Sequence, residues 1–175
     1  MNIPRLIATA LGARSLRAPQ IAVVIGKRGA GKTWHALNIA ASLTLIKHPL
    51  PVLLFAPGAD KLVLLNQLRA VWKSSELRAA PLFIETTPRL WPVEMWLIAR
   101  RIDRALHRRG TRLGLIIVDD LHRIGGLSYD HRLSDLAFLA RDLGRFIIVL
   151  SRPHRALTLS IRRQRVEHVA IARDK

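Results

Sequence analysis

The sequence predicts an α/β fold in which a parallel sheet is covered by helices on both faces. Short apolar runs rich in Val, Ile and Leu alternate along the chain with longer segments of helical pattern. Strands that are apolar at every position, rather than at every second one, are typical of a parallel sheet buried on both faces. Half of the 175 residues are hydrophobic, which supports one well-buried domain in a chain too short for two comfortable ones.

Each predicted strand is one of these apolar runs. In chain order the runs are IAVVI, VLLFA, LFIE, LIIVD, FIIVL and HVAIA. Most of them are followed by a segment of helical pattern. We expect strands at Ile21–Ile25, Val52–Ala56, Leu82–Glu85, Leu115–Asp119, Phe146–Leu150 and His168–Ala172, with helices at Lys32–Ile46, Lys61–Trp72, Pro92–Arg109 and Asp130–Leu143.

The chain is expected to form a single domain. It shows no internal repeat and no low-complexity linker, so we expect one domain over residues 21–175. A short basic segment over residues 1–20 is expected to pack beside it as a lead-in helix or strap. No apolar run approaches the ~20 residues of a membrane span. The absence of cysteine excludes disulfides and thiolate metal sites and suits a reducing compartment, so we expect a cytoplasmic or, for a virus, a virion-associated protein.

The chain is strongly basic. Lys and Arg number 29 against 12 Asp and Glu, a formal net charge of +17 at pH 7, and most of the basic residues are arginines. Such an excess favours a polyanionic partner, because basic side chains neutralise phosphates and release counterions. We favour nucleic acid as this partner; the alternatives are an Arg-rich genome bias and an anionic membrane surface.

A glycine-rich loop joins the first predicted strand to the first predicted helix. The octapeptide GKRGAGKT fits the pattern G-x-x-x-x-G-K-[ST] in the strand–loop–helix context that this motif requires. Its glycines let backbone N–H groups point at phosphate oxygens, and the helix start adds its positive end. Lys32 is expected to reach the β- and γ-phosphates, and the Thr33 hydroxyl to bind Mg²⁺. The expected cofactors are ATP and Mg²⁺, with the nucleotide bound by Gly26, Lys27, Arg28, Gly29, Ala30, Gly31, Lys32, Thr33 and Trp34.

The fourth predicted strand ends in two adjacent acids. The stretch LGLIIVDD has the Walker B pattern, four apolar residues followed by a carboxylate. Asp119 is expected to hold Mg²⁺, usually through water, because this ion keeps much of its hydration shell. Asp120 is expected to orient or deprotonate the attacking water; the alternative is that it caps the helical segment that follows.

The fifth predicted strand, FIIVL, is followed by the polar residue Ser151. In the ASCE class of P-loop ATPases, which has an additional strand between the two Walker strands, this position senses the γ-phosphate. Ser151 is our candidate for that role, and capping of the strand end is the alternative. The predicted fold is therefore a RecA-like (ASCE) P-loop NTPase with a parallel sheet flanked by helices.

The helix expected over Pro92–Arg109 has two different faces. Met95, Ile98, Ile102 and Leu106 share one face at helical spacing and are expected to point inward. The rest of the helix is crowded with basic residues, for which few acids are available. This basic surface is either solvated or in contact with a DNA backbone or a neighbouring subunit. Its members are Arg100, Arg101, Arg104, His107 and Arg108.

A polar loop, HRIGGLSYDHR, follows the Walker B strand. In ring-shaped motors the loop at this point commonly faces the central pore. Its side chains are then candidate DNA contacts, with charge for phosphate and a ring for a base or sugar; an ordinary surface loop is the alternative. The candidates are Arg123, Tyr129, His131 and Arg132.

The segment LAFLARDLGRFIIVLSRP resembles the part of FtsK–HerA-type DNA-pumping ATPases in which an Arg-bearing helix and a glycine precede an apolar strand. Here these residues are Arg141 and Gly144, and the strand ends Ser151-Arg152-Pro153 where many members have Gln-Arg-Pro. The stretch SIRRQRVEHVAIAR is similar to the last segment of the family. The small genome-packaging ATPases of membrane-containing viruses are the most similar in size and motif order.

This resemblance covers most of the chain from Ile21 onward and implies an ATPase that moves double-stranded DNA. The implied partners are double-stranded DNA, further copies of the chain in a ring of five or six, and a viral portal or membrane protein. An arginine of the neighbouring subunit would stabilise charge on the transferring phosphoryl group. Arg141 is the first candidate for this arginine; Arg152, Arg155 and Arg162 are reserves.

The chain departs from this family at Asp120, where many members have Glu, and at Ser151, where Gln is usual.

A second resemblance is to DnaB-type replicative helicases, in GKTWHALNIAASL and PVLLFAPGADKLVLLNQLRA, although Ala56-Pro57-Gly58 stands where that family has a catalytic Glu. The strand IIVDDLH is similar to that of DnaA/DnaC-like AAA+ helicase loaders. Outside these classes, a P-loop kinase with SIRRQRVEH as an Arg lid and a non-catalytic, nucleotide-switched DNA-binding module remain alternatives.

Overall fold

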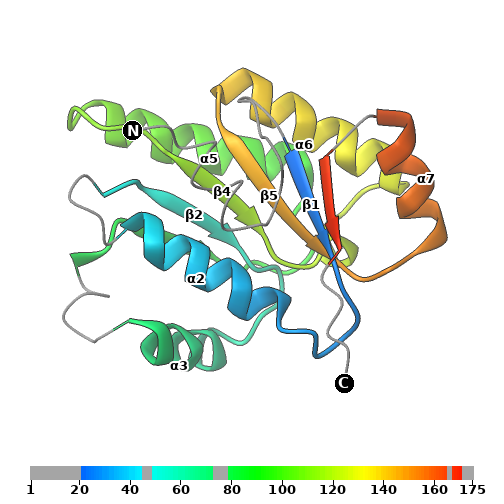
Figure 1. Ribbon diagram of the computed structural model, residues 1–175. Helices are drawn as coiled ribbons and strands as arrows, with labels where there is room; N and C mark the ends of the chain where they lie inside the picture. Colours follow the sequence, from blue (N-terminus) through cyan, green and yellow to red (C-terminus); the bar gives the residue numbers. More distant parts are fainter. Residues whose placement is uncertain (1–20, 45–48, 73–78, 165–166, 171–175) are drawn as a thin grey trace.

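The computed structural model describes residues 21–44, 49–72, 79–164 and 167–170. Within these residues, six strands form one sheet in the order β3-β2-β4-β5-β1-β6, and every neighbouring pair is parallel (Figure 1). The predicted α/β fold class is thereby confirmed. The strands are β1 (Ile21–Ile25), β2 (Val52–Phe55), β3 (Leu82–Glu85), β4 (Leu115–Val118), β5 (Phe146–Ser151) and β6 (Glu167–Ala170).

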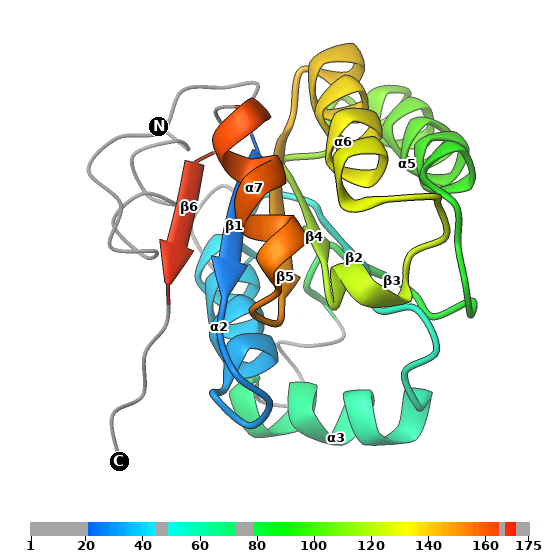
Figure 2. The same ribbon diagram turned by 90° about the vertical axis from the view of Figure 1, so that its right-hand side faces the viewer.

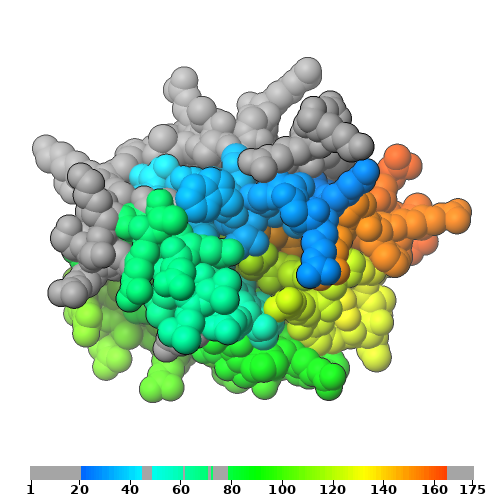
Figure 3. Space-filling model, turned by 90° about the horizontal axis from the view of Figure 1, so that it is seen from below, coloured from blue at the N-terminus to red at the C-terminus, as the bar shows by residue number. Residues whose placement is uncertain are grey.

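Helices cover both faces of this sheet, as Figure 2 shows from the side of β6. The helices α2 (Lys32–Thr44) and α3 (Lys61–Val71) lie on one face, and Figure 3 views the molecule from their side. The opposite face carries α5, α6 and α7. Their bounds are Pro92–His107 for α5, Tyr129–Leu143 for α6 and Arg155–Gln164 for α7, and a 3-10 helix, η1, spans Leu121–Arg123.

The core has two parts, one on each side of the sheet. Successive residues of a strand point to opposite faces. In β1, Val24 packs with the cluster under α2 and α3, whereas Val23 packs with the cluster under α5, α6 and α7, and both are fully buried. This explains why the strands are apolar at every position. Burial of each Val or Ile side chain contributes about 1.5–3 kcal/mol, so both faces stabilise the sheet.

Local signals define several helix ends. The Asp60 side chain accepts hydrogen bonds from Leu62 N and Val63 N at the start of α3. The Ser128 hydroxyl accepts from His131 N at the start of α6. That helix ends at Gly144, whose φ of +63° is the left-handed conformation common after a helix.

Within the described residues, the predicted elements agree closely with the observed ones, except that two elements were missed. The helix α7 was not predicted, because its sequence, RALTLSIRRQ, buries only Leu157, Ser160 and Ile161 and otherwise consists mostly of basic and polar residues. The 3-10 helix η1 was not predicted either. The predicted segment over residues 1–20 lies outside the described residues, as do the predicted ends of the first helix at residues 45–46 and of the last strand at residues 171–172.

The inward face of α5 also differs from the prediction. Met95 and Leu106 are buried as expected, but Ile98 and Ile102 are only half-buried. The buried stripe instead runs through Ala99 and Asp103, which are four and eight residues after Met95. The reason is that Asp103 has hydrogen-bond and charged partners, so this charged residue can take a buried position on the inward face.

Those partners come from two other segments. The Asp103 carboxylate accepts hydrogen bonds from Leu113 N at 2.9 Å and from Arg112 Nε at 3.0 Å. It also lies 3.5 Å from the Arg145 guanidinium. Burial opposes the charge of Asp103, but the hydrogen bonds from Arg112 and Leu113 and the nearby arginine charges hold its pKa below the ordinary value. This network joins α5 to the chain segments that enter β4 and β5.

Candidate nucleotide-binding site

The glycine-rich loop lies at the carboxyl edge of the sheet, between β1 and α2. Gly26 N donates to the carbonyl of Ser151 at 3.2 Å, which fixes the loop to the end of β5. Gly29 and Gly31 have φ values of +80° and +76°, a conformation that side chains other than glycine rarely adopt. The loop therefore curls in the way its sequence predicts, and α2 begins directly after it.

The Lys32 side chain lies within the curled loop and forms hydrogen bonds with its backbone. Its Nζ donates to the carbonyl oxygens of Gly26, at 2.8 Å, and Lys27, at 2.9 Å. Burial lowers the pKa of Lys32 from its ordinary value, although the charges of Asp119 and Asp120 act in the opposite direction. The ammonium group is thus positioned within the loop, where bound phosphates would meet it.

Thr33 and Asp119 bring the two predicted motifs into contact. The Thr33 hydroxyl donates to Asp119 Oδ2 at 2.9 Å, across 86 positions of sequence. Asp119 follows the last residue of β4, and its backbone N–H donates to Phe55 O at the end of β2. Burial raises the pKa of Asp119, and the neighbouring charge of Asp120 adds to this, while the Thr33 hydrogen bond opposes it.

Asp120 is held in an unusual backbone conformation and is paired with arginines. Its φ of +69° and ψ of +85° are uncommon for a residue other than glycine. Its Oδ1 accepts from His122 N, so it caps η1, which is the alternative that the sequence left open. Its Oδ2 lies 2.9 Å from the Arg152 guanidinium and 3.6 Å from that of Arg123. The same carboxylate therefore has a local structural contact and two charged partners at the site.

Ser151 ends the strand that separates the two motifs. The sheet order places β5 between β1 and β4, the arrangement expected for the ASCE class. Ser151 is fully buried, and its hydroxyl donates to the carbonyl of Arg152 at 3.2 Å. Its own carbonyl accepts from Gly26 N, as described above. The observed contacts of Ser151 are thus with the backbone of the site.

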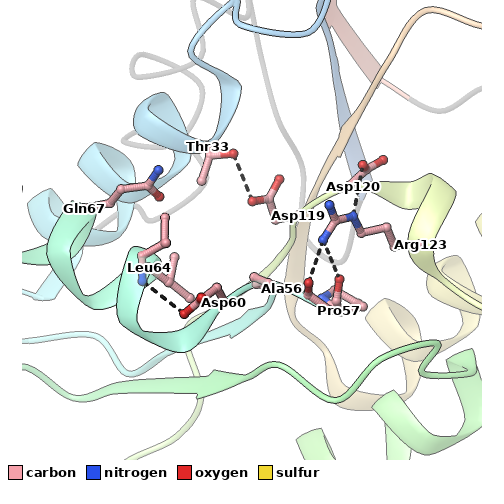
Figure 4. Close-up of a pocket in the computed structure, with 12 residues that line it drawn as sticks. Thr33, Ala56, Pro57, Asp60, Leu64, Gln67, Asp119, Asp120 and Arg123 are labelled. Carbon is pink, nitrogen blue, oxygen red and sulfur yellow. Dashed lines mark hydrogen bonds and ion pairs between the residues drawn. The ribbon is translucent and has the colours of Figure 1, made fainter.

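A hollow of about 310 Å³ opens between these groups and the start of α3. Figure 4 shows Thr33 and Asp119 pointing toward each other on one side of it, with Asp60 and Gln67 on the other. Arg123 closes one end, where its guanidinium donates to the carbonyl oxygens of Pro57 at 3.1 Å and Gly58 at 3.0 Å. Arg123, a candidate DNA contact from sequence, thus links η1 to the loop after β2.

Sequence reasoning did not place Asp60 and Gln67 at the site. The signal that could have found them is the end of β2. Because the carboxyl ends of parallel strands meet at one edge of a sheet, the residues that follow each strand gather there. The segment after β2, APGAD, is such a segment.

The other predicted residues lie in several different places. Lys27 and Arg28 are exposed within the loop, and Trp34 is exposed directly after it. Arg141 is exposed at the end of α6, which leads into the start of β5 at the opposite edge of the sheet from the glycine-rich loop. The structure therefore brings Arg152 to the site of its own chain but does not bring Arg141 there. The reserve candidates Arg155 and Arg162 are exposed on α7.

The loop after β4 is held mainly by its own side chains. The Tyr129 hydroxyl and His122 Nδ1 are 2.6 Å apart. The Arg132 guanidinium lies 5.5 Å from the Tyr129 ring centre and donates to Gly126 O at 3.0 Å. His131 is exposed and lies 2.7 Å from the Ser128 hydroxyl. All four candidate DNA contacts therefore have partners within the chain.

The donor set of the site fits Mg²⁺ and a triphosphate. Within the described residues, no group of three or more His, Cys, Asp or Glu is placed to hold a metal ion by itself. A hydroxyl and one carboxylate in contact suit Mg²⁺, which is commonly bound by one or two carboxylates together with substrate phosphates and water. The lysine ammonium beside them suits the phosphates.

The parallel sheet, its flanking helices and this arrangement define a RecA-like α/β fold of the P-loop NTPase type. One solved structure with this fold is that of a DnaB-like replicative helicase described with its interactions with primase; the match has a TM-score of 0.64 and 17% sequence identity. It covers 78% of this chain and 40% of the helicase chain, so the protein spans less than half the length of that structure. No family model matches the sequence, and no curated protein matches it.

None of the described helices has the length and apolar character needed to cross a membrane.

Proposed function

We propose that the protein is an ATPase that moves double-stranded DNA. The observation that carries this proposal is the 2.9 Å hydrogen bond from Thr33 to Asp119, which joins the end of the glycine-rich loop to the acidic end of β4. With Lys32 folded into the same loop, the groups that would bind a Mg²⁺-triphosphate lie close together. The net charge of +17 supports a polyanion as the partner on which the enzyme acts.

The proposed cofactors are ATP and Mg²⁺. Thr33 and Asp119 would hold the metal, and Lys32 with the backbone N–H groups of the loop would bind the phosphates. The metal would neutralise charge on the phosphates while the γ-phosphoryl group is transferred.

The remaining chemistry is assigned to this chain's own residues. Asp120 would orient the attacking water and accept its proton, as a carboxylate next to the metal ligand commonly does. Arg152, paired with Asp120, would lie close enough to respond to the γ-phosphate. Ser151 would act through the backbone contact that ties β5 to Gly26. An arginine of a neighbouring copy, with Arg141 as the first candidate, would complete the site in a ring of five or six copies.

The finer function we propose is genome packaging in a virus, with a portal or membrane protein as a further partner and a cytoplasmic or virion-associated location. It is supported by the resemblance of the segment that ends Ser151-Arg152-Pro153 to FtsK–HerA-type ATPases. The position of β5 between β1 and β4 is compatible with that class.

The test is ATP hydrolysis by the purified protein, measured with and without double-stranded DNA at low salt. We expect turnover that rises at least several-fold with duplex. A hydrolysis rate that does not change when duplex is added would contradict the proposal of a DNA-moving motor. Transfer of phosphate to a small acceptor would identify a kinase instead. Nucleotide binding without hydrolysis would favour the alternative of a non-catalytic, nucleotide-switched DNA-binding module.

A replicative helicase is the second candidate, and the likeness to the DnaB-like structure favours it. The two functions differ in what they do to a forked substrate. A packaging motor should leave the paired strands together while it hydrolyses ATP, whereas a helicase should separate them. A strand-separation assay with a labelled fork therefore decides between them.

A further inference from the structure

The outer side of α5 carries a row of exposed arginines. Arg101, Arg104 and Arg108 are spaced at i, i+3 and i+7, so their side chains lie along one side of the helix and its carboxyl-terminal cap. All three are exposed. The opposite side of α5 holds Met95 and Ala99, which are fully buried against the sheet. We call Arg101, Arg104 and Arg108 the arginine row.

The acids of α5 are engaged elsewhere and do not neutralise this row. Asp103 is buried and pairs with Arg112, at 2.7 Å, and with Arg145, at 3.5 Å. Glu94 accepts a hydrogen bond from Trp91 N at the other end of the helix. Among the residues that the structure describes, no ion pair includes a member of the row. Like charges at this spacing repel one another, so the row requires counterions or a polyanion.

The row is extended toward α6 by two more arginines. Arg100 lies 4.9 Å from the ring centre of Trp96, whose Nε1 donates to Asp142 at 2.8 Å. This contact connects α5 to the end of α6, where Arg141 is exposed. Figure 2 shows α5 and α6 next to each other at the outside of the molecule. Two further arginines, one on each helix, therefore lie near this contact.

The arginine row lies at the opposite edge of the sheet from the nucleotide site. After α5 ends, the chain enters β4 at Leu115, and Asp119 follows the other end of that strand. The residues of the arginine row are thus near the amino ends of the strands, whereas Lys32 and Thr33 lie near the carboxyl ends. A ligand on the row would not compete with a bound nucleotide.

We propose that the arginine row binds the phosphate backbone of double-stranded DNA. Arginine presents a planar fork that forms paired hydrogen bonds with phosphate oxygens, and the row contains no lysine. The helix rises roughly 10 Å between Arg101 and Arg108, which is about three nucleotide steps of a duplex. Three guanidinium groups can therefore contact phosphates within a run of four along one strand. The choice of DNA as the polyanion rests on the proposed function, but the contact itself requires no hydrolysis.

The experiment measures binding of a short fluorescent duplex to the full chain, without nucleotide, over about 50 to 200 mM salt. The test variant is Arg101→Gln/Arg104→Gln/Arg108→Gln. The matched control is Arg69→Gln/Arg89→Gln/Arg163→Gln, which removes the same charge from exposed arginines on α3, on the loop after β3 and on α7. Thermal unfolding of both variants shows whether the fold is kept, as the exposed positions predict.

We expect the row variant to bind at least about ten-fold more weakly at 100 mM salt, with a salt slope shallower by about 2 to 3, because each phosphate contact contributes about 0.9. The control should change affinity by less than about three-fold. An equal loss in both variants would show that net charge alone drives binding, and no loss in the row variant would place the DNA elsewhere. Either result overturns the proposal.

Two further measurements separate the alternatives. Val93 and Leu97 are exposed on the same side of α5, so vesicles containing phosphatidylserine are tested in parallel. Loss of vesicle binding with unchanged duplex binding in the row variant would overturn the proposal in favour of a membrane surface. If the wild type binds duplex through the row but does not hydrolyse ATP, the proposed function fails while the contact stands.

Discussion

The carboxylate of Asp120 lies 2.9 Å from the guanidinium of Arg152, so the acid next to the expected metal ligand is charge-paired within its own chain. The arginine comes from the end of β5 and the acid from the end of β4. These strands are neighbours in the sheet, and both residues stand at its carboxyl edge. A change at one of them is therefore felt directly by the other.

Asp120→Asn is expected to leave nucleotide binding within about three-fold of the wild type and to lower hydrolysis by about 10²–10⁴-fold, the usual contribution of a general base. Asn tolerates the left-handed backbone conformation of this position, so the fold should be kept. Fluorescent-nucleotide titration and phosphate release measure the two effects separately. Weakened nucleotide binding would contradict the assignment, because the residue would then be acting on the ground state.

Lys32→Ala should abolish hydrolysis and weaken triphosphate binding by at least about ten-fold, because a charge-assisted contact to phosphate contributes about 1.5–3 kcal/mol. The variant also removes two hydrogen bonds to the carbonyl oxygens of Gly26 and Lys27. Arg69→Ala, an exposed position on α3, removes one positive charge away from the site and serves as the control. Equal losses in both variants would show that bulk charge, and not the loop lysine, is responsible.

Asp103→Asn tests the buried network of α5. The change removes the charge that pairs with Arg112 and Arg145, and we expect the free energy of unfolding to fall by about 2–4 kcal/mol. The pKa of Asp103 is lower in the folded protein than its ordinary value. Its stabilisation is therefore present above about pH 4 and is lost as the pH falls through the folded pKa.

Urea unfolding at a series of pH values measures this dependence. The wild type should lose stability on acidification more steeply than Asp103→Asn. Parallel curves for the two proteins would contradict the role given to this carboxylate.

Gly125→Ala tests the contact between the loop after β4 and the start of α5. A Cβ at position 125 would lie 2.8 Å from the indole of Trp91, which is closer than such atoms approach. Because this indole is about half exposed, it can move outward, and we expect a loss of about 1–2 kcal/mol and not a failure to fold. Thermal unfolding measures the loss, and an unchanged midpoint would show that the contact does not stabilise the loop.

The fold was largely predictable because its signals are local. Runs such as FIIVL and LIIV specify strands buried on both faces, and the glycines of GKRGAGKT specify one particular turn. The helix α7 was missed because only a few apolar residues indicate it. This helix packs beside α6, and that contact cannot be recognised from the sequence of α7 alone.

The site was predictable as far as its motifs extend. Lys32, Thr33 and Asp119 were chosen from their two motifs, and the structure brings Thr33 and Asp119 into contact, while the roles of all three stay predictions. The pairing of Asp120 with Arg152 was not predicted, because it depends on the adjacency of two strands whose ends are far apart in the chain. Burial of Asp103 had no local signal for the same reason, since its partners Arg112 and Arg145 come from outside its helix.

The strand β5 separates the two strands that carry the motifs. Because it lies between β1 and β4, the ends of these two strands are two inter-strand distances apart, roughly 10 Å. A truncated side chain in β5 would leave a cavity beside the sheet, and relaxation around it would shift the two strand ends without touching either motif. Variants of its buried centre, such as Val149→Ala, would then impair turnover from a position that no ligand reaches.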